Sequence, residues 1–195
     1  MEISARDVMR LREKTGIGMM KCKEALADAN GDFDKAIEIL RKQGLEAADR
    51  RAGRETSEGR IGFYVHHTGK VAAMVELRCE SDFVASNAEF RQFANNLCMH
   101  IVAANPIALD RSQIPPEIIE KEREIYREQV KGKPPQVVEK IVEGKLNKFY
   151  QERCLLEQPF VLNQDETVEQ HLKRLIDKFG ENMRIVRFVR FQLGE

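Results

Sequence analysis

Histidine and cysteine side chains are the groups in this sequence that could bind a metal ion. His66 and His67 are adjacent on an expected strand, so they point to opposite faces of it. Cys98 and His100 lie two positions apart on an expected helix, roughly on opposite sides. Because neither pair can chelate one ion, we expect no metal site, and we expect no cofactor.

Patterns typical of catalysis are also missing. The sequence has no G-x-S-x-G motif, and its four cysteines form no C-x-x-C pair and lie in apolar or helical contexts. We therefore expect buried free thiols in a reducing compartment. The glycines of TGIGMMK could cradle a phosphate at a helix N-terminus, but no strand precedes them and no GK[ST] follows, which favours a loop between helices.

The segment RIVRFVRF has a composition that could bind RNA. Its three arginines interleave with Phe188 and Phe191, which suits the stacking of bases on a sheet. A strand packed on both faces, with arginine stems at its margin, explains the same pattern. The chain carries 32 basic and 32 acidic residues and no basic stripe, so we expect no direct contact with nucleic acid.

A membrane partner is not expected either. The longest apolar runs fall short of the roughly 18 residues that a membrane-spanning helix needs. The first ten residues, MEISARDVMR, lack the apolar stretch of a signal peptide. The sequence thus predicts a cytoplasmic protein.

Phe83 follows Ser81 and Asp82 directly after an expected strand, and its position allows two interpretations. Extrapolated at 100° per residue along the following helix, Phe83 falls on the same side as Phe90 and Ile101, which favours a core residue. If that helix starts slightly later, Asp82 and Phe83 lie on an exposed strand-to-helix corner. An aromatic at such a corner could enter a pocket of a partner protein.

The elements that would position these residues begin with a three-helix pattern over residues 1–45. Ser4 and Asp32 are suited to cap the first and third helices, and TGIG separates the first helix from the second. Gly44 is expected to stop the third helix. Residues 46–59 have almost no large apolar side chain and are dense in charge, which predicts a linker.

Beyond the linker the apolar period changes from that of a helix to that of a strand. Residues 61–66 and 71–79 alternate on either side of a turn at Thr68-Gly69, which predicts a hairpin. Further core elements are expected at about 84–105 (helix), 167–180 (helix) and 183–194 (closing strand).

Residues 115–157 have the pattern of a helical hairpin. Prolines open each helix at the permitted first turn, and the apolar stripes are narrow. Narrow stripes indicate two antiparallel helices that pack mainly on each other and project as an arm. The sequence therefore predicts an α+β core at 60–195, with a small antiparallel sheet and this arm, behind the N-terminal three-helix module.

Two stretches of the chain resemble known signatures. LREKTGIGMMKCKEAL at 11–26 and VELRCESDFVASN at 75–87 resemble the two signatures of bacterial translation elongation factor Ts. The likeness continues in order through MHIVAANP, VVEKIVEGKLNKF, QPFV and RFVRFQLGE, so it spans essentially the whole chain. The resemblance implies a guanine-nucleotide exchange factor that promotes GDP release from elongation factor Tu without bond chemistry. It also implies that the N-terminal module is of the ubiquitin-associated type.

The resemblance further implies a set of partner-binding residues. The Asp-Phe of the family's second signature meets the GTPase domain of elongation factor Tu near its Mg²⁺ and phosphate site, which corresponds here to Asp82 and Phe83, flanked by Ser81 and Val84. The histidine of MH, His100, is a further candidate that would face another domain of the partner. The N-terminal module would contact the GTPase domain through Arg12, Met19, Met20 and Lys23.

Two positions depart from the family signature, which usually has Asn and Thr where this chain has Arg78 and Ser81. Serine keeps the hydroxyl, so the corner is expected to survive, whereas Arg78 bears on the local sheet contacts. The chain resembles a short form of the family that lacks a duplicated half of the core. Since short members can dimerise, we expect a homodimer or a two-plus-two complex.

Two other functions remain alternatives at this point. The helical bundle would suit a non-catalytic adaptor that binds peptide or ubiquitin-like partners. The closing strand would suit an RNA-binding module. Neither alternative explains the signature that follows the hairpin.

Overall fold

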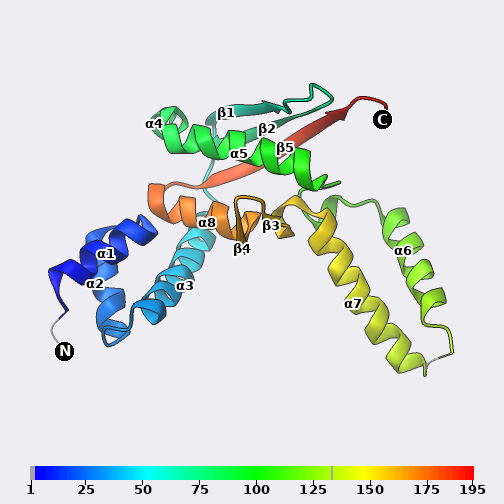
Figure 1. The fold of residues 1–195 in the computed structure, drawn as a ribbon, viewed down its shortest axis with the longest axis horizontal. Coiled ribbons are helices and arrows are strands. Elements are labelled where there is room, and N and C mark those ends of the chain that lie inside the picture. The colour runs from blue at the N-terminus through cyan, green and yellow to red at the C-terminus, as the bar shows by residue number, and fades with distance from the viewer. Residues whose placement is uncertain (1–2, 133) are drawn as a thin grey trace.

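The N-terminal part of the molecule is a cluster of three helices with its own apolar core. The computed structural model describes residues 3–132 and 134–195 (Figure 1). The three helices are α1 (Ala5–Thr15), α2 (Met19–Asp28) and α3 (Phe33–Arg51). Ser4 and Asp32 cap α1 and α3 through their side-chain oxygens, as the sequence predicts. The side chains buried between the helices include Val8, Leu11, Cys22, Leu26, Ala36 and Leu40.

The third helix is longer than the sequence predicts, so the expected stop at Gly44 is wrong. The helix continues to Arg51, and its last turns bury Ala47 and Ala48. Gly44 faces Asp177 of a later helix, where small side chains allow close packing of the two helices. The expected linker at 46–59 is therefore helical as far as Arg51. The prediction considers only large apolar side chains, whereas this part of the helix is buried through small ones.

The core sheet has three strands and is antiparallel throughout. Its order is β1-β2-β5. The turn between β1 and β2 contains Gly69, which has a positive φ of 66°. The expected hairpin and closing strand are thus confirmed, with the bounds β1 (Glu58–Val65), β2 (Val71–Cys79) and β5 (Met183–Gln192).

The helix expected at about 84–105 is interrupted near its start. It forms α4 (Asp82–Ser86) and α5 (Ala88–Ala104), separated by Asn87. Asn87 has an extended backbone, and its side chain accepts a hydrogen bond from the N–H of Glu89, so it caps the second helix. The axis of α5 therefore does not predict which way α4 faces.

The main core lies between one face of the sheet, α5 and α8 (Val168–Phe179). Gly62 allows β1 to approach α5 closely, because a Cβ on Gly62 would lie 2.6 Å from the carbonyl oxygen of Ala94. A short hairpin of β3 (Pro159–Phe160) and β4 (Asn163–Thr167) precedes α8. The fully buried residues of this core include Leu77, Phe90, Leu97, Ile101, Phe160 and Leu175.

The expected helical hairpin forms an arm at the end of the molecule opposite the N-terminal helices (Figure 1). It consists of α6 (Pro116–Gln129) and α7 (Pro135–Arg153), each opened by a proline. The two helices share a small cluster around Val130, Val142 and Leu146. Short 3₁₀ turns at Arg111–Gln113 and Leu155–Glu157 flank the arm. These elements together confirm an α+β fold.

The second face of the sheet carries apolar side chains that no described element covers; we call it the outer sheet face. Its cross-strand rows are Phe63-Met74-Val189 and Val65-Ala72-Phe191. The phenylalanines are the most exposed large side chains of these rows, at 68% for Phe63 and 64% for Phe191. An exposed apolar face of this kind is typical of an interaction surface.

Two further expectations can be compared with the described residues. All four cysteines are free and buried, as expected. None of the described helices combines the length and the apolar character that crossing a membrane would require.

Candidate functional site

The strand-to-helix corner from Ser81 to Val84 joins β2 to α4. Phe83 is 80% exposed there, and Asp82 beside it is also exposed. Val84 is buried in the core, so it anchors the corner from inside and does not present a surface to a partner. The interpretation of Phe83 as a core residue is therefore wrong. The break at Asn87 is the reason, because it turns α4 away from the apolar face of α5.

Ser81 fixes the start of α4 with its hydroxyl group. Its Oγ accepts a hydrogen bond from the N–H of Val84 at 3.3 Å, which makes Ser81 the N-cap of the helix. The same hydroxyl donates to Oε1 of Glu181 at 2.6 Å, and the Ser81 N–H donates to Oε2 at 3.0 Å. Ser81 thus sits within the corner's framework and not on its exposed tip.

Glu181 is a residue that sequence reasoning missed. It lies 100 positions from Ser81 in the chain, in the short connection between α8 and β5. The backbone N–H of the next residue, Asn182, donates a hydrogen bond to Oε1 of Glu80. Its side-chain amide donates to the carbonyl oxygens of Ala52 and Arg54. The connection after α8 therefore holds both the corner and the chain that leaves α3.

The predicted residues of the N-terminal module lie where α1 ends and α2 begins. Arg12 is in the last turn of α1, and Met19, Met20 and Lys23 are in the first turns of α2; all four are exposed. Met20 is the more exposed of the two methionines, at 69% against 38% for Met19. Figure 1 shows α1 and α2 at the same end of the long axis as α4. The structure thus brings these residues and Phe83 to one end of the molecule.

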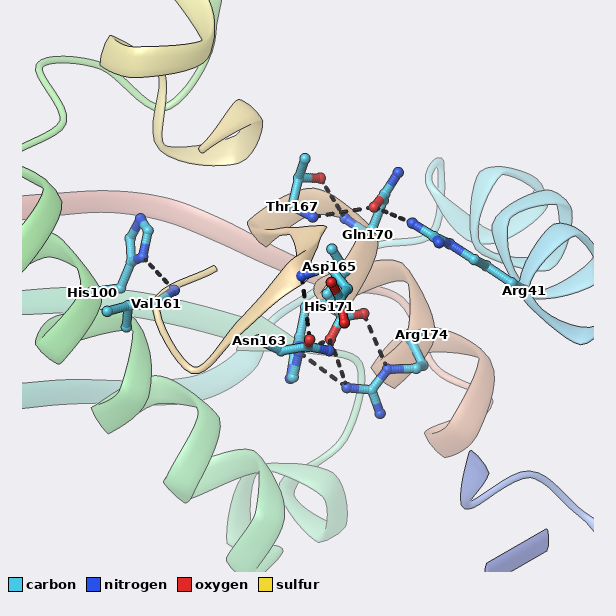
Figure 2. Close-up of polar contacts among 10 residues, drawn as sticks. Arg41, His100, Val161, Asn163, Asp165, Thr167, Gln170, His171 and Arg174 are labelled. Carbon is cyan, nitrogen blue, oxygen red and sulfur yellow. Dashed lines mark hydrogen bonds and ion pairs between the residues drawn. The ribbon is translucent and has the colours of Figure 1, made fainter. Parts of the chain in front are cut away.

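Polar contacts fix the module against α8. Lys21 forms an ion pair of 2.6 Å with Asp177, whose side chain is nearly inaccessible, and Arg51 lies 3.8 Å from the same carboxylate. Arg41 of α3 donates a hydrogen bond to Gln170 at the start of α8 (Figure 2). These contacts set the position of the module relative to the corner, because α8 also leads into Glu181.

His100 is placed differently from the other candidates. It is 1% exposed on α5, and Nδ1 of its ring accepts a hydrogen bond from the N–H of Val161 at 3.2 Å (Figure 2). Nε2 lies 2.8 Å from Oε1 of Gln158, which assigns the proton to Nε2. Burial lowers the pKa of His100, and the contact with Gln158 opposes that effect. The ring therefore joins α5 to the β3–β4 hairpin and is not on the surface.

Metal binding and nucleophilic catalysis by cysteine can both be examined at the described residues. Among residues 3–132 and 134–195, no group of three or more His, Cys, Asp or Glu side chains is arranged to hold a metal ion. Burial raises the pKa of Cys79 to about 11 and that of Cys98 to about 12. These two thiols stay protonated near neutral pH, so they are poor nucleophiles.

Arg78, which departs from the family signature, is paired within the sheet, one position beyond a register shift between Glu76 and Leu77 in the pairing of β2 with β5. Its Nε donates to Oε1 of Glu76 at 2.7 Å, and Arg187 of β5 donates to Oε2 at 2.8 Å. The strand pairing continues on both sides of Arg78. The substitution therefore leaves the corner's supporting strand in place.

Comparison with known proteins identifies the family. The family model described as "Elongation factor TS" matches residues 7–195. A protein of Fervidobacterium nodosum named elongation factor Ts is 57% identical over 197 residues, which cover 100% of both chains. One of the same name from Thermosipho melanesiensis is 53% identical, over 99% of this chain and 100% of the other. With matches of this extent along almost its whole length, the chain belongs to the elongation factor Ts family of translation elongation factors.

Proposed function

We propose that this chain is a cytoplasmic guanine-nucleotide exchange factor that binds GDP-loaded elongation factor Tu and promotes release of the nucleotide without bond chemistry. The observation that carries the proposal is the exposure of Phe83, at 80%, beside Asp82 on a corner whose backbone is held by hydrogen bonds. An exposed aromatic on a fixed support is suited to enter a pocket of a partner, because little order is lost on binding.

The mechanism follows from linkage between two ligands of one protein. A GTPase holds GDP through Mg²⁺ and through backbone donors around the phosphates. A wedge that displaces these groups weakens nucleotide binding by the same factor by which the nucleotide weakens binding of the wedge. Phe83 would supply the bulk of the wedge, and Asp82 would place a negative charge near the site that the phosphates occupy.

Phe83 does not supply enough free energy by itself. Full burial of one phenylalanine contributes about 1.5 to 3 kcal/mol, equivalent to a tenfold to hundredfold change in an equilibrium constant. The remaining binding free energy is assigned to Arg12, Met19, Met20 and Lys23 at the same end of the molecule. Charge at Arg12 and Lys23 would also guide the encounter with the GTPase.

The test measures loss of fluorescent GDP from preloaded elongation factor Tu. Phe83→Ala should slow GDP release by at least about tenfold at a fixed concentration of the exchange factor, since the wedge is truncated. Ile125→Ala, which removes an exposed apolar side chain from the arm, is the matched control and should release GDP as fast as the unmodified protein. A Phe83→Ala variant as fast as the control would show that the wedge assignment is wrong.

The same mixing experiment distinguishes an exchange factor from both alternatives, because an adaptor or an RNA-binding module would leave GDP release unchanged. The arginines of β5 give the RNA-binding alternative little support. Arg187 pairs with Glu76 at 2.8 Å, and Arg190 pairs with Glu195 at 3.1 Å. These two ion pairs reduce the positive charge that Arg187 and Arg190 would offer to RNA phosphates.

We further propose that the chain forms a homodimer, alone or within a two-plus-two complex with elongation factor Tu, through the outer sheet face. The charged side chains beside the apolar rows are paired, because Arg78 and Arg187 share the carboxylate of Glu76. An apolar face of this kind can be covered by the same face of a second copy through a two-fold axis.

A further inference from the structure

The tip of the corner is small and exposed, which raises the question of what keeps it in one orientation. Helix α4 spans only Asp82–Ser86, and an isolated helix of that length is not stable in water. Phe83 itself makes no contribution to the core, since its side chain is largely exposed. The orientation of the tip must therefore come from the residues on either side of it.

Val84 and Ala85 hold the C-terminal side of the tip, because both side chains are buried. The N-terminal side depends on Ser81, whose hydroxyl has one proton to donate and one oxygen to accept with. It uses the oxygen to cap α4 and the proton to reach Glu181. The Glu181 carboxylate also takes the Ser81 N–H, so both polar groups at the start of the corner converge on one side chain.

The position of Glu181 is in turn fixed by backbone geometry. Helix α8 ends at Gly180, which has a φ of 74°, a conformation that glycine adopts without strain. This turn is followed directly by Glu181 and then by the buried Asn182. The carboxylate therefore reaches Ser81 from a short connection that is held by the hydrogen bonds of Asn182.

We propose that Glu181 is a positioning residue, which orients the Asp82-Phe83 tip by accepting both hydrogen bonds from Ser81. This inference rests on the proposed function for its consequence, but the orientation itself is a property of the free protein. Two charge-assisted hydrogen bonds to one serine restrict the rotation of the corner more than an N-cap alone would. A tip held in this way would enter the GTPase site without first having to be ordered.

The first test uses tryptophan fluorescence in the absence of any partner. The chain has no tryptophan, so Phe83→Trp introduces a single reporter at the tip. In that background, Glu181→Gln should lower the anisotropy of the tryptophan, because the amide nitrogen cannot accept the hydrogen bond that the carboxylate accepts. Glu169→Gln on α8, which removes a carboxylate that contacts Lys173, should leave the anisotropy unchanged. Unchanged anisotropy in Glu181→Gln would overturn the proposal.

The second test separates orientation from binding in the exchange reaction. Glu181→Gln should lower the maximal rate of GDP release at saturating exchange factor by about tenfold, equivalent to about 1.4 kcal/mol, and should change the half-saturating concentration little. Ser81→Ala should behave similarly, whereas Ser81→Thr, which keeps the hydroxyl, should retain the full rate. A loss confined to the half-saturating concentration would contradict a positioning role.

The two tests also distinguish this inference from the proposed function. If Glu181→Gln lowers the anisotropy while Phe83→Ala leaves GDP release unchanged, the positioning role stands and the wedge fails. If Phe83→Ala slows release but Glu181→Gln affects neither anisotropy nor maximal rate, the wedge stands and the positioning role is wrong. Thermal unfolding of each variant checks that the fold is retained.

Discussion

At the scale of single residues, the corner depends on one hydroxyl group with two partners. The family signature usually has threonine where this chain has Ser81. Since both residues carry a hydroxyl group, the sequence predicts that the corner is retained. Its use as an N-cap for α4 agrees with that prediction. Glu181 could not be predicted, because no local pattern connects two residues that are 100 positions apart. Long-range polar pairs of this kind require the folded chain.

A second polar cluster predicts how stability should depend on pH. Burial would raise the pKa of Glu166, but hydrogen bonds from His171 and Arg174 outweigh this effect and lower it to about 2. A carboxyl group whose pKa is lower in the folded state stabilises the fold above its unfolded pKa. This contribution should be lost as the pH falls from about 4.5 towards 2.

The change that tests this cluster is Glu166→Gln. On acidification, the free energy of unfolding should fall by about 2 kcal/mol less in the variant than in the unmodified protein, after allowance for solvent screening. Urea unfolding at several pH values measures the difference. Asp165→Asn is the matched control, since its side chain is a neighbouring exposed carboxylate. Equal acid sensitivity of Glu166→Gln and the unmodified protein would contradict the assignment.

At the scale of elements, most helices and strands could be predicted from apolar periodicity and capping residues. The hairpin, the arm and α8 all follow the expected pattern. The two errors have different causes. Gly44 does not stop α3, because α8 packs against it, and the local sequence does not contain that contact. Asn87 interrupts a helix through a local cap on Glu89, although the apolar period continues across it.

Two glycines in different surroundings are expected to respond in opposite ways to substitution by alanine. Gly62→Ala should destabilise the protein by about 1 to 3 kcal/mol, because the new Cβ would lie 2.6 Å from the Ala94 carbonyl oxygen. Gly144→Ala, in the interior of α7 with no atom within 4 Å, should stabilise it by up to about 1 kcal/mol. Denaturant unfolding of both variants measures the signs. A stabilising Gly62→Ala would show that β1 and α5 are less tightly packed.

At the scale of the whole molecule, the candidate contact residues lie at one end and the arm lies at the other (Figure 1). The sequence predicted the alternation of β1 and β2 but did not indicate that one apolar face would remain uncovered. Phe63 alternates with Gly62 and Tyr64, and periodicity does not reveal that Gly62 and Tyr64 face the core while Phe63 faces away from it. The folded arrangement of α5 decides which face is covered.

The uncovered face predicts the assembly state. Phe63→Asp should weaken self-association by about hundredfold, since it places a charge in an apolar contact. Sedimentation equilibrium should find a dimer for the unmodified protein and a monomer for the variant. Phe83→Asp carries the same change at an exposed site away from this face, so it should remain dimeric. A monomeric unmodified protein at micromolar concentration would exclude the proposed homodimer.

The distance along the chain between Ser81 and Glu181 also has a consequence for synthesis on the ribosome. The N-terminal helices possess their own apolar core and can fold as soon as they emerge. The corner has to wait until about a hundred further residues have been translated, because Glu181 and β5 are needed to complete its support. A nascent chain is therefore expected to acquire an ordered N-terminal bundle well before the Asp82-Phe83 tip has its full support.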